Sequence, residues 1–501
     1  MDSVLQRIQH YAQNTPDRIA LIGRSADGKG VEVTYASLWQ DIERLSNTLT
    51  SWGVTCIALY AENSLAWAKI DLAAMLAGVT VVPVPTFFSS AQQAHLLAVS
   101  GAEVWIGHRG KPDVVPRHEL AGLPCYFLPP QSSRRLHGGA AKITFTSGST
   151  GTPKGVALSA GLLNAVTASL ASSFCLEGQS ADSIPSKHLV ALPLTTLLEN
   201  ITGLYVPLYL GVQSIVLSGE DVGLHGSSQF EPERFAAAVS TYQAESLVVT
   251  PALLLALVAL AKRSPGCLSS LKFIAVGGAK VPQALLTSAR QLGLPIYEGY
   301  GLSECGSVVS MNTPEQQRLG SVGKPLPHCQ VAISRQGEIM VSGASMLGYL
   351  GELPLTGAVH TGDLGYLDDE GFLYITGRKK NLLITAFGRN ISPEWIEAEA
   401  MAFPHLRQIV ILGDGCAALS AVVATDNPEA AISELESLNT RLPDYAAVSH
   451  LIFTRPFHFQ PALLTENGRP KRGEFARRFS RYIPTNVRAG TGDNRVTSCF
   501  E

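Results

Sequence analysis

The sequence predicts an α/β protein with a large N-terminal domain of stacked mixed sheets and helices, followed by a small α+β domain. Three observations predict this fold. Short β-branched runs alternate with helical patterns up to about residue 375, the strand-like runs are apolar on both faces, and the pattern changes after Arg378. Such alternation is typical of mostly parallel sheets whose two faces are covered by helices. We place the N-terminal domain at residues 1–379 and the C-terminal domain at residues 380–501.

The N-terminal domain contains several apolar runs that predict buried strands. Helical patterns occur between them, for example at residues 64–78 and 235–244, and the first 23 residues read as an amphipathic helix without the apolar core of a signal peptide. The predicted strands lie within residues 54–61, 79–85, 102–107, 188–194, 213–219, 245–251 and 271–278.

The C-terminal domain begins after a polar junction at Lys379–Asn381, in which Lys380 and Asn381 are the candidate hinge. A helical block at residues 388–406 is followed by strand-like runs at 407–414 and 420–425. A second helix at 432–442 and a closing strand at 451–457 complete a compact α+β pattern. From about residue 484 the composition predicts a loose, flexible tail.

Composition favours a small-molecule partner over nucleic acid or membrane. The charged fraction is 16%, the hydrophobic fraction 46% and the formal net charge −3, and no Lys/Arg block forms a basic stripe. The apolar stretches are shorter than the roughly 20 residues of a transmembrane helix. The eight cysteines show no CxxC pairs and no Cys/His clusters, so reduced thiols in a cytoplasmic protein fit best. We expect a monomer or a homodimer.

Residues 142–155, KITFTSGSTGTPKG, form an apolar strand that runs into a loop suited to polyphosphate. Glycines allow several backbone N–H groups to point at one anion, hydroxyls add donors and a lysine adds charge. The spacing is not that of a Walker A loop, and a Gly/Ser-rich surface turn is the alternative on composition alone. The candidate phosphate ligands are Thr146, Ser147, Gly148, Ser149, Thr150, Gly151 and Lys154.

The run TSGSTGTPKG closely resembles the phosphate-loop signature of the adenylate-forming superfamily, which includes acyl-CoA synthetases, peptide-synthetase adenylation domains and luciferases. Further resemblances follow in order along nearly the whole chain, up to the NGRPKR segment. The resemblance implies a distorted β-barrel subdomain in the N-terminal part and a mobile C-terminal domain. It also implies ATP and Mg²⁺ as cofactors.

The nucleotide site implied by this resemblance is spread over three segments. In YEGYGLSECG, residues 297–306, Tyr300 would stack beside adenine, Ser303 would contact the α-phosphate or the acyl carboxylate, and Glu304 would bind Mg²⁺. A hard cation prefers such carboxylate oxygens. In residues 360–381, Asp363 would accept hydrogen bonds from the ribose hydroxyls, with Arg378 close by. The remaining candidates line the adenine and the acyl tunnel: Gly277, Gly278, Ala279, Glu298, Gly299 and Gly301.

The acyl pocket implied by the resemblance begins in LPLTTLLENITGLYVPLYLG, residues 192–211. Thr195 and Thr196 stand where many relatives carry a histidine or aromatic gate, and Gly277 and Gly301 complete the predicted pocket. The pattern around Glu199 resembles long-chain fatty acyl-CoA synthetases. No acidic residue stands clearly placed for an amino group, so we expect an apolar acid, medium- to long-chain fatty or similar.

The second half-reaction is assigned by resemblance to residues 384–400, where Gly388 would line a channel for the thiol. Relatives carry a catalytic lysine after an Asn-Gly or Thr-Gly pair near the C-terminus. Here Arg469 occupies that position and Lys471 follows two residues later, so either cation could serve adenylation, or both could be exposed charges.

These resemblances predict an ATP-dependent ligase that converts a carboxylic acid to acyl-AMP and then transfers the acyl group to a thiol, with coenzyme A as the co-substrate. Two alternatives stay open. An acyl carrier protein could accept the acyl group in a lipid or natural-product pathway. A non-catalytic acyl- or nucleotide-binding protein is the alternative from a different class, motivated by Arg469 and the two threonines.

Overall fold

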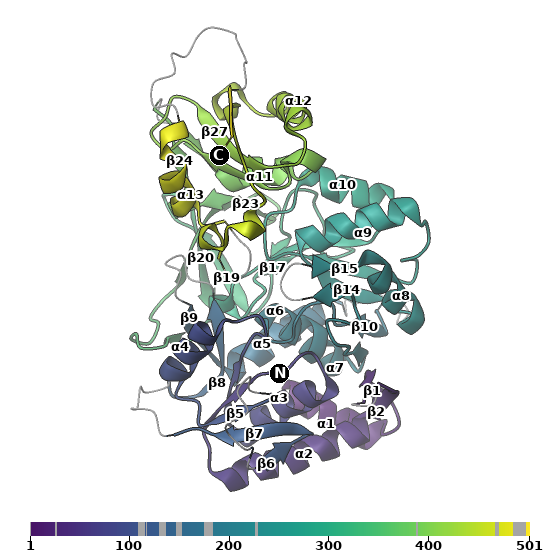
Figure 1. Cartoon of the computed structure of the whole chain (residues 1–501). Helices are drawn as coiled ribbons and strands as arrows, with labels where there is room; N and C mark the ends of the chain where they lie inside the picture. Colours follow the sequence, from purple (N-terminus) through teal and green to yellow (C-terminus); the bar gives the residue numbers. More distant parts are fainter. Residues whose placement is uncertain are drawn as a thin grey trace.

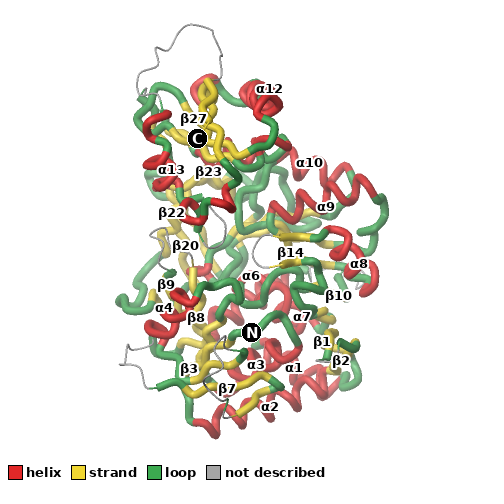
Figure 2. Tube along the Cα trace, in the orientation of Figure 1, coloured by secondary structure: helices red, strands yellow, loops and turns green. Residues whose placement is uncertain are grey.

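The computed structural model arranges the chain as a large body of two stacked sheets and a smaller C-terminal part above it (Figures 1 and 2). The structure describes residues 2–25, 28–108, 116, 118–129, 137–146, 153–174, 184–225, 229–386, 389–465, 470–483 and 497–500.

The first sheet has eight strands in the order β21-β9-β8-β4-β3-β5-β7-β6. Its centre is parallel, β8 to β4 to β3 to β5, and its flanks are antiparallel. The predicted strands at 54–61, 79–85 and 102–107 are thereby confirmed as β3, β4 and β5. The strand bounds are β3 Cys56–Leu59, β4 Thr80–Pro83, β5 Val104–Ile106, β6 His118–Leu120, β7 Leu123–Phe127, β8 Ala140–Thr146, β9 Lys154–Ser159 and β21 Gly348–Tyr349.

The second sheet has nine strands in the order β18-β17-β16-β15-β14-β10-β11-β1-β2. The strands from β16 to β1 are parallel, so their carboxyl ends meet at one edge, where open α/β sheets bind ligands. The bounds are β1 Ile19–Arg24, β2 Gly30–Thr34, β10 Lys187–Leu189, β11 Gln213–Ile215, β14 Ser246–Val249, β15 Phe273–Val276, β16 Ile296–Tyr300, β17 Ser310–Met311 and β18 Lys324–Pro325.

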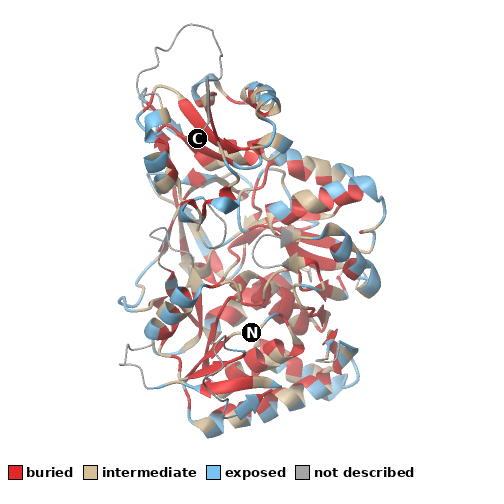
Figure 3. Cartoon of the chain, viewed as in Figure 1, coloured by how far each residue is buried: buried red, intermediate tan, exposed pale blue. Residues whose placement is uncertain are grey.

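The two faces of the second sheet are covered by different helices. On one face α8 (Pro232–Tyr242), α9 (Pro251–Arg263) and α10 (Gln283–Gln291) form a buried cluster with alternate strand residues such as Leu247 and Ile274. On the other face α5 (Ala160–Ser172), the π-helix η2 (Asn200–Tyr205) and α7 (Val206–Leu210) lie between the two sheets and share one core with both. Figure 3 shows the strands buried and the outer faces of α9 and α10 exposed.

The helices begin and end with strong local signals. Ser3 caps α1 (Val4–Asn14) in a capping box with Gln6, so the predicted N-terminal helix is confirmed up to Asn14. Its predicted continuation is wrong, because Ile19–Arg24 forms β1. Thr34 and Ser64 cap α2 (Tyr35–Trp52) and α3 (Leu65–Ala77), and both helices end at a glycine in the left-handed conformation. Ser89 caps α4 (Ser90–Ser100).

A buried polar network joins the phosphate-loop strand to the π-helix. Lys142 on β8 donates to Asp71 at 2.7 Å and to Tyr205 Oη at 3.0 Å, and it also contacts Asn200 Oδ1. Asp71 in turn accepts from Tyr205 at 2.6 Å and from Asn200 at 3.0 Å. Because all four side chains are almost fully buried, this network fixes β8 and η2 relative to α3.

A third, antiparallel sheet lies in the part of the fold where the resemblance implies a barrel subdomain. Its order is β19-β20-β22-β23, with bounds β19 Cys329–Ile333, β20 Glu338–Gly343, β22 Val359–Leu367 and β23 Leu373–Arg378. β23 leads into the short 3₁₀-helix η4 (Lys379–Asn381), which contains the candidate hinge.

The C-terminal part packs helices on a four-stranded sheet, as the sequence predicts. The predicted loose tail is wrong at its far end, because Thr497–Phe500 forms β29 and pairs in parallel with β28. β29 forms the edge strand of this sheet. A local sequence pattern could not predict it, because the pairing joins two segments that are far apart in the sequence. The bounds are β24 Leu383–Ile384, β25 Asn390–Ile391, α11 Pro393–Ala400, β26 Ile409–Leu412, β27 Leu419–Ala424, α12 Pro428–Asn439, β28 Val448–Thr454 and α13 Arg472–Arg478.

A search of the described ranges for membrane-crossing helices finds none of sufficient length and apolarity.

Candidate active site

Three residues predicted from two separate segments meet beside the carboxyl end of β16. Tyr300 donates its hydroxyl to Asp363 Oδ2 at 2.7 Å. Arg378 Nε forms an ion pair with Asp363 Oδ1 at 2.6 Å, and its Nη2 donates a hydrogen bond to Oδ2 at 3.4 Å. The ion pair follows from strand register, because Asp363 on β22 is the direct partner of Arg378 on β23.

The Asp363 carboxylate is held in a low-dielectric position. It is 4% exposed, and burial raises the pKa of its carboxyl while Arg378 opposes that rise. Burial and the neighbouring Asp363 raise the pKa of the Tyr300 phenol, so this hydroxyl stays a donor. The cluster thus presents a buried hydrogen-bond acceptor and a half-exposed guanidinium at the carboxyl edge of the second sheet.

A second chain of contacts connects Glu304 to the end of the phosphate loop. Tyr349 on β21 donates to Glu304 Oε1 at 2.7 Å. Lys154, the first residue of β9, lies with its Nζ 4.9 Å from the centre of the Tyr349 ring and pairs with Glu352 at 2.9 Å. Thr146 ends β8 on the opposite side of the loop, as Thr146 and Lys154 are register partners. Ser147, Gly148, Ser149, Thr150 and Gly151 lie outside the described residues.

The glycines of the nucleotide segments allow close backbone approach. A Cβ on Gly301 would lie 1.6 Å from the Ser307 carbonyl oxygen, and a Cβ on Gly277 would lie 3.1 Å from the Gly299 oxygen. Ser307 itself has a φ of 88°, a strained value for a residue other than glycine. Only glycine therefore fits position 301, and Ser303 follows in the one-turn helix η3 (Ser303–Cys305).

A buried glutamate and a partly buried lysine lie behind the glycine-rich turn. Glu298 on β16 is buried, and desolvation raises the pKa of its carboxyl to about 8, with the charge of Lys280 opposing the rise. Lys280 donates to the Ile375 carbonyl on β23 at 3.2 Å. Burial lowers the pKa of its amino group, and the negative charges of Glu399 and Glu394 of α11 oppose that fall. Lys280 and Tyr349 are not among the residues predicted from the sequence, since neither stands in a motif that signals its contacts. Gly278 and Ala279 lie exposed at the same turn.

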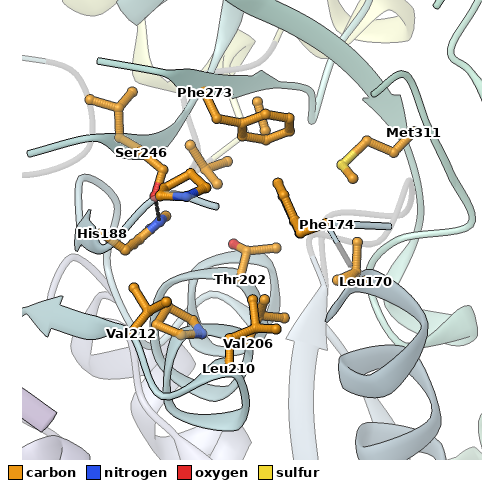
Figure 4. A pocket seen from close by; sticks show the side chains of 15 residues that line it. Leu170, Phe174, His188, Thr202, Val206, Leu210, Val212, Ser246, Phe273 and Met311 are labelled. Carbon is orange, nitrogen blue, oxygen red and sulfur yellow. Dashed lines mark hydrogen bonds between the residues drawn. The ribbon is translucent and has the colours of Figure 1, made fainter. Parts of the chain in front are cut away.

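An apolar pocket opens on the inner face of the second sheet (Figure 4). Ala275 of β15 lines it two residues before Gly277, and Met311 lines it as the register partner of Gly299. The predicted Thr195 and Thr196 do not line this cavity, whereas Thr202 of the π-helix does. Thr195 is buried, and its hydroxyl has no hydrogen-bond partner among the described residues. Thr196 donates to the Pro193 carbonyl at 2.7 Å.

The hinge contacts the start of α11 in the C-terminal part. Asn381 donates to Glu394 Oε1 at 2.5 Å, and Lys380, the other hinge candidate, is exposed. A Cβ on Gly377 would lie 2.6 Å from Ser392 Oγ, so β23 and the start of α11 are tightly packed.

The lysine segment is also tied to α11. Arg472 forms two hydrogen bonds to Glu397, of 2.6 and 2.9 Å, and one to the Ile411 carbonyl at 2.5 Å. Lys471 stands directly before it as the N-cap of α13, and its side chain forms no ion pair with Glu304 or Asp363 in this conformation. Arg469 and Gly388 lie outside the described residues.

Comparisons with known proteins show the family to which the chain belongs. Residues 8–350 match the family described as AMP-binding enzyme. The 2-succinylbenzoate–CoA ligase of Bacillus licheniformis is 30% identical over 436 residues, which cover 81% of this chain and 86% of that protein. Feruloyl-CoA synthase of an Amycolatopsis species is 28% identical over 489 residues, covering 90% and 94%. O-succinylbenzoate coenzyme A synthetase of Bacillus subtilis, solved with ATP and magnesium ion, has a TM-score of 0.73 at 25% identity, covering 93% of this chain and 98% of that one.

The chain belongs to the AMP-binding enzyme family. It is an enzyme of the AMP-forming acid–CoA ligase class, with ATP and Mg²⁺ as cofactors and coenzyme A as co-substrate. The predicted superfamily, fold class and enzyme class are confirmed. The acid and the roles of individual residues are not given by these matches.

Proposed function

We propose that this enzyme activates an apolar-bodied carboxylic acid as its acyl-adenylate at the carboxyl edge of β15 and β16, and then joins the acyl group to coenzyme A. The observation that carries the proposal is the meeting of Tyr300, Asp363 and Arg378 beside a cavity with apolar walls. A buried carboxylate next to a guanidinium suits a ribose, and the cavity beside it suits the acid.

The nucleotide is held from two sides in this proposal. Asp363 accepts the ribose hydroxyls, Tyr300 lies against the adenine, and Gly277, Gly278, Ala279, Glu298, Gly299 and Gly301 form the close-fitting turn beneath it. The phosphates lie along the loop that ends at Lys154. That lysine is half exposed and pairs with an exposed Glu352, so the pair separates at little cost when an anion binds.

Glu304 fits the role of a magnesium ligand. One carboxylate oxygen is occupied by Tyr349, and among the described residues the other accepts no hydrogen bond. A magnesium ion bound there together with phosphate oxygens would neutralise charge on the phosphates. Ser303, one residue before Glu304, would donate its hydroxyl to the acid carboxylate or the α-phosphate.

The first step is attack of the acid carboxylate oxygen on the α-phosphorus, with pyrophosphate as the leaving group. The protein needs to position the reactants and supply cations where negative charge develops. Lys471 or Arg469 is the proposed cation. For the second step the C-terminal part would rotate about Lys380 and Asn381, which exchanges the lysine region for the thiol channel lined by Gly388.

An aryl acid is favoured over a fatty acid. The relatives matched along most of the chain are ligases of 2-succinylbenzoate and of ferulate. A long-chain fatty acid ligase of Mycobacterium bovis is 40% identical, but over 161 residues that cover 31% of this chain. The fatty acid predicted from the Glu199 pattern therefore stays a prediction, as do the cytoplasmic location and the oligomeric state.

ATP–pyrophosphate exchange with a mixed panel of aryl, short and fatty acids tests the proposal. We expect exchange with at least one aryl acid and loss of exchange in either Lys471→Ala or Arg469→Ala, but not equally in both. No exchange with any acid, while AMP still binds the folded chain, would support the non-catalytic alternative instead.

A further inference from the structure

The cavity beside the nucleotide site has a polar side and an apolar side. Figure 4 shows His188 and Ser246 together at one side, with Met311, Phe174 and Leu170 at the other. Phe174 and Phe273 meet edge to face, with ring centres 4.8 Å apart. Walls of this kind suit a flat aromatic ring, because aromatic pairs prefer such offset and perpendicular contacts.

The polar side is built by strand register. His188 on β10 is the direct partner of Ser246 on β14, so their side chains stand next to each other on the inner face. His188 Nδ1 lies 3.0 Å from Ser246 Oγ, and both residues are less than a tenth exposed. Ser246 thus has one side toward histidine and one toward the cavity that it lines.

Glu199 lies behind the histidine. Its Oε1 is 3.7 Å from His188 Nε2 and accepts a hydrogen bond from the Ala191 N–H at 3.0 Å. The residue is fully buried, and neither Glu199 Oε2 nor His188 Nε2 has a hydrogen-bond partner among the described residues. A buried carboxyl without further partners is costly unless it has a role or shares a proton. A single proton between Glu199 and His188 makes the pair neutral, whichever residue carries it.

The polar side lies away from the reacting end. The nucleotide site is at β15 and β16, whereas His188 is on β10, two strands beyond β15 in the sheet order. Ser246 is on β14, next to β15, and its register partner there is Phe273, four residues before Gly277. At about 3.3 Å per residue the polar pair lies roughly 13 Å along the strands from the nucleotide turn. The end of an aryl acid opposite its carboxylate points in that direction.

We propose that the His188–Ser246 pair, held in place by Glu199, selects an aryl acid that carries an uncharged hydrogen-bonding group, such as a hydroxyl, at the end opposite its carboxylate. Ser246 makes the contact, His188 orients the serine hydroxyl, and Glu199 is a positioning residue for His188. No Lys or Arg is among the described residues that line the cavity, so a second carboxylate would be buried without a counter-charge. The inference rests on the proposed function, of which it names the substrate class.

The test compares three acids that differ at one position: 3-(4-hydroxyphenyl)propenoic acid, 3-phenylpropenoic acid and 3-(4-carboxyphenyl)propenoic acid. The assay is ATP–pyrophosphate exchange by the full chain, and the readout is the ratio of kcat/KM between acids. We expect the hydroxylated acid to be preferred over the unsubstituted one by about tenfold to a hundredfold, the range of one buried hydrogen bond. The dicarboxylic acid should be the poorest of the three.

Two variants test the residues, and a third is the control. Ser246→Ala and the near-isosteric Glu199→Gln should each bring the preference ratio to within about threefold of one. Val248→Ala, on the same strand and lining the same cavity, should change kcat/KM for the hydroxylated and unsubstituted acids by similar factors and keep their ratio.

The outcomes separate this inference from the proposed function. Equal use of hydroxylated and unsubstituted acids by the unaltered enzyme, or a preference that Ser246→Ala and Glu199→Gln leave intact, overturns the inference while exchange itself upholds the proposed function. Absence of exchange with every acid of the wider panel overturns the proposed function.

Discussion

Substituting Asp363 by asparagine should impair nucleotide use far more than it impairs folding. The Asp363 carboxylate accepts two hydrogen bonds, from Tyr300 at 2.7 Å and from Arg378 Nη2 at 3.4 Å, and it forms an ion-pair contact with Arg378 Nε at 2.6 Å. In asparagine one of the two carboxylate oxygens is replaced by an NH₂ group. At that position an N–H donor faces another donor, so the hydrogen bond is lost. Losing one ribose contact to the charged carboxylate costs about 1.5–3 kcal/mol. Losing the contact with the half-exposed Arg378 adds about 0.2–1 kcal/mol, which makes roughly 2–4 kcal/mol in all.

That free energy corresponds to a fall of about 30-fold to 1,000-fold in kcat/KM for ATP. The melting temperature should fall little, because the Arg378 side chain is 46% exposed and water solvates the guanidinium that loses its partner. ATP–pyrophosphate exchange at varied ATP and thermal unfolding measure the two effects.

The matched control is Asp368→Asn. Asp368 follows the same strand and also pairs with an arginine, Arg318 at 2.6 Å, but it lies in the turn between β22 and β23. The control should keep the KM for ATP. An unchanged KM and kcat in Asp363→Asn, or an equal loss in Asp368→Asn, would refute the reasoning.

Three further substitutions have expected outcomes. Lys142→Met removes one partner of the buried Asp71 pair and should lower the stability of the N-terminal part by about 3–5 kcal/mol in denaturant unfolding; a smaller loss than in an exposed-pair control such as Arg263→Met would contradict the network's role. Burial raises the pKa of Glu298 to about 8, so the folded state keeps a proton that the unfolded chain releases, and stability should fall as the pH rises from about 4.5 through 8. In Glu298→Gln the melting temperature should depend much less on pH over that interval. A pH dependence equal to that of the unaltered enzyme would contradict the role of the buried acid. Arg472→Met should break the pair with Glu397, lower the stability of the C-terminal part by about 3–5 kcal/mol and slow exchange by displacing Lys471; exchange at the original rate in this variant would show that the segment is not positioned by Arg472.

The sequence predicts those parts of the site that depend on local patterns. The strand that ends at Thr146, the turn at Gly301 and the facing of Asp363 to Arg378 lie in short motifs whose spacing matches a known family. Here the local chain conformation alone determines the contacts. The predicted strands at β10, β11, β14 and β15 are confirmed for the same reason, since each is a short apolar run bounded by polar or turn residues.

Features that depend on pairing between distant segments could not be predicted. Tyr349 reaches Glu304 because a two-residue strand joins the edge of the first sheet beside β9, and two residues carry no periodic signal. Likewise, His188 meets Ser246 only through the register of two strands that are 58 residues apart.

The lining of the apolar cavity depends on a local feature that the sequence does not signal. Residues Asn200–Tyr205 form a π-helix, whose wider turn changes which side chains face the sheet. Thr202 therefore lines the cavity while Thr195 and Thr196 do not, and an interpretation based on an ordinary helix would not place it there.

The most direct test of the central claim is mass spectrometry of the products formed from an aryl acid and MgATP, with and without coenzyme A. We expect acyl-AMP and pyrophosphate in the absence of coenzyme A, and acyl-CoA and AMP in equal amounts when it is present. Formation of ADP and phosphate, or acyl-CoA without AMP, would contradict it.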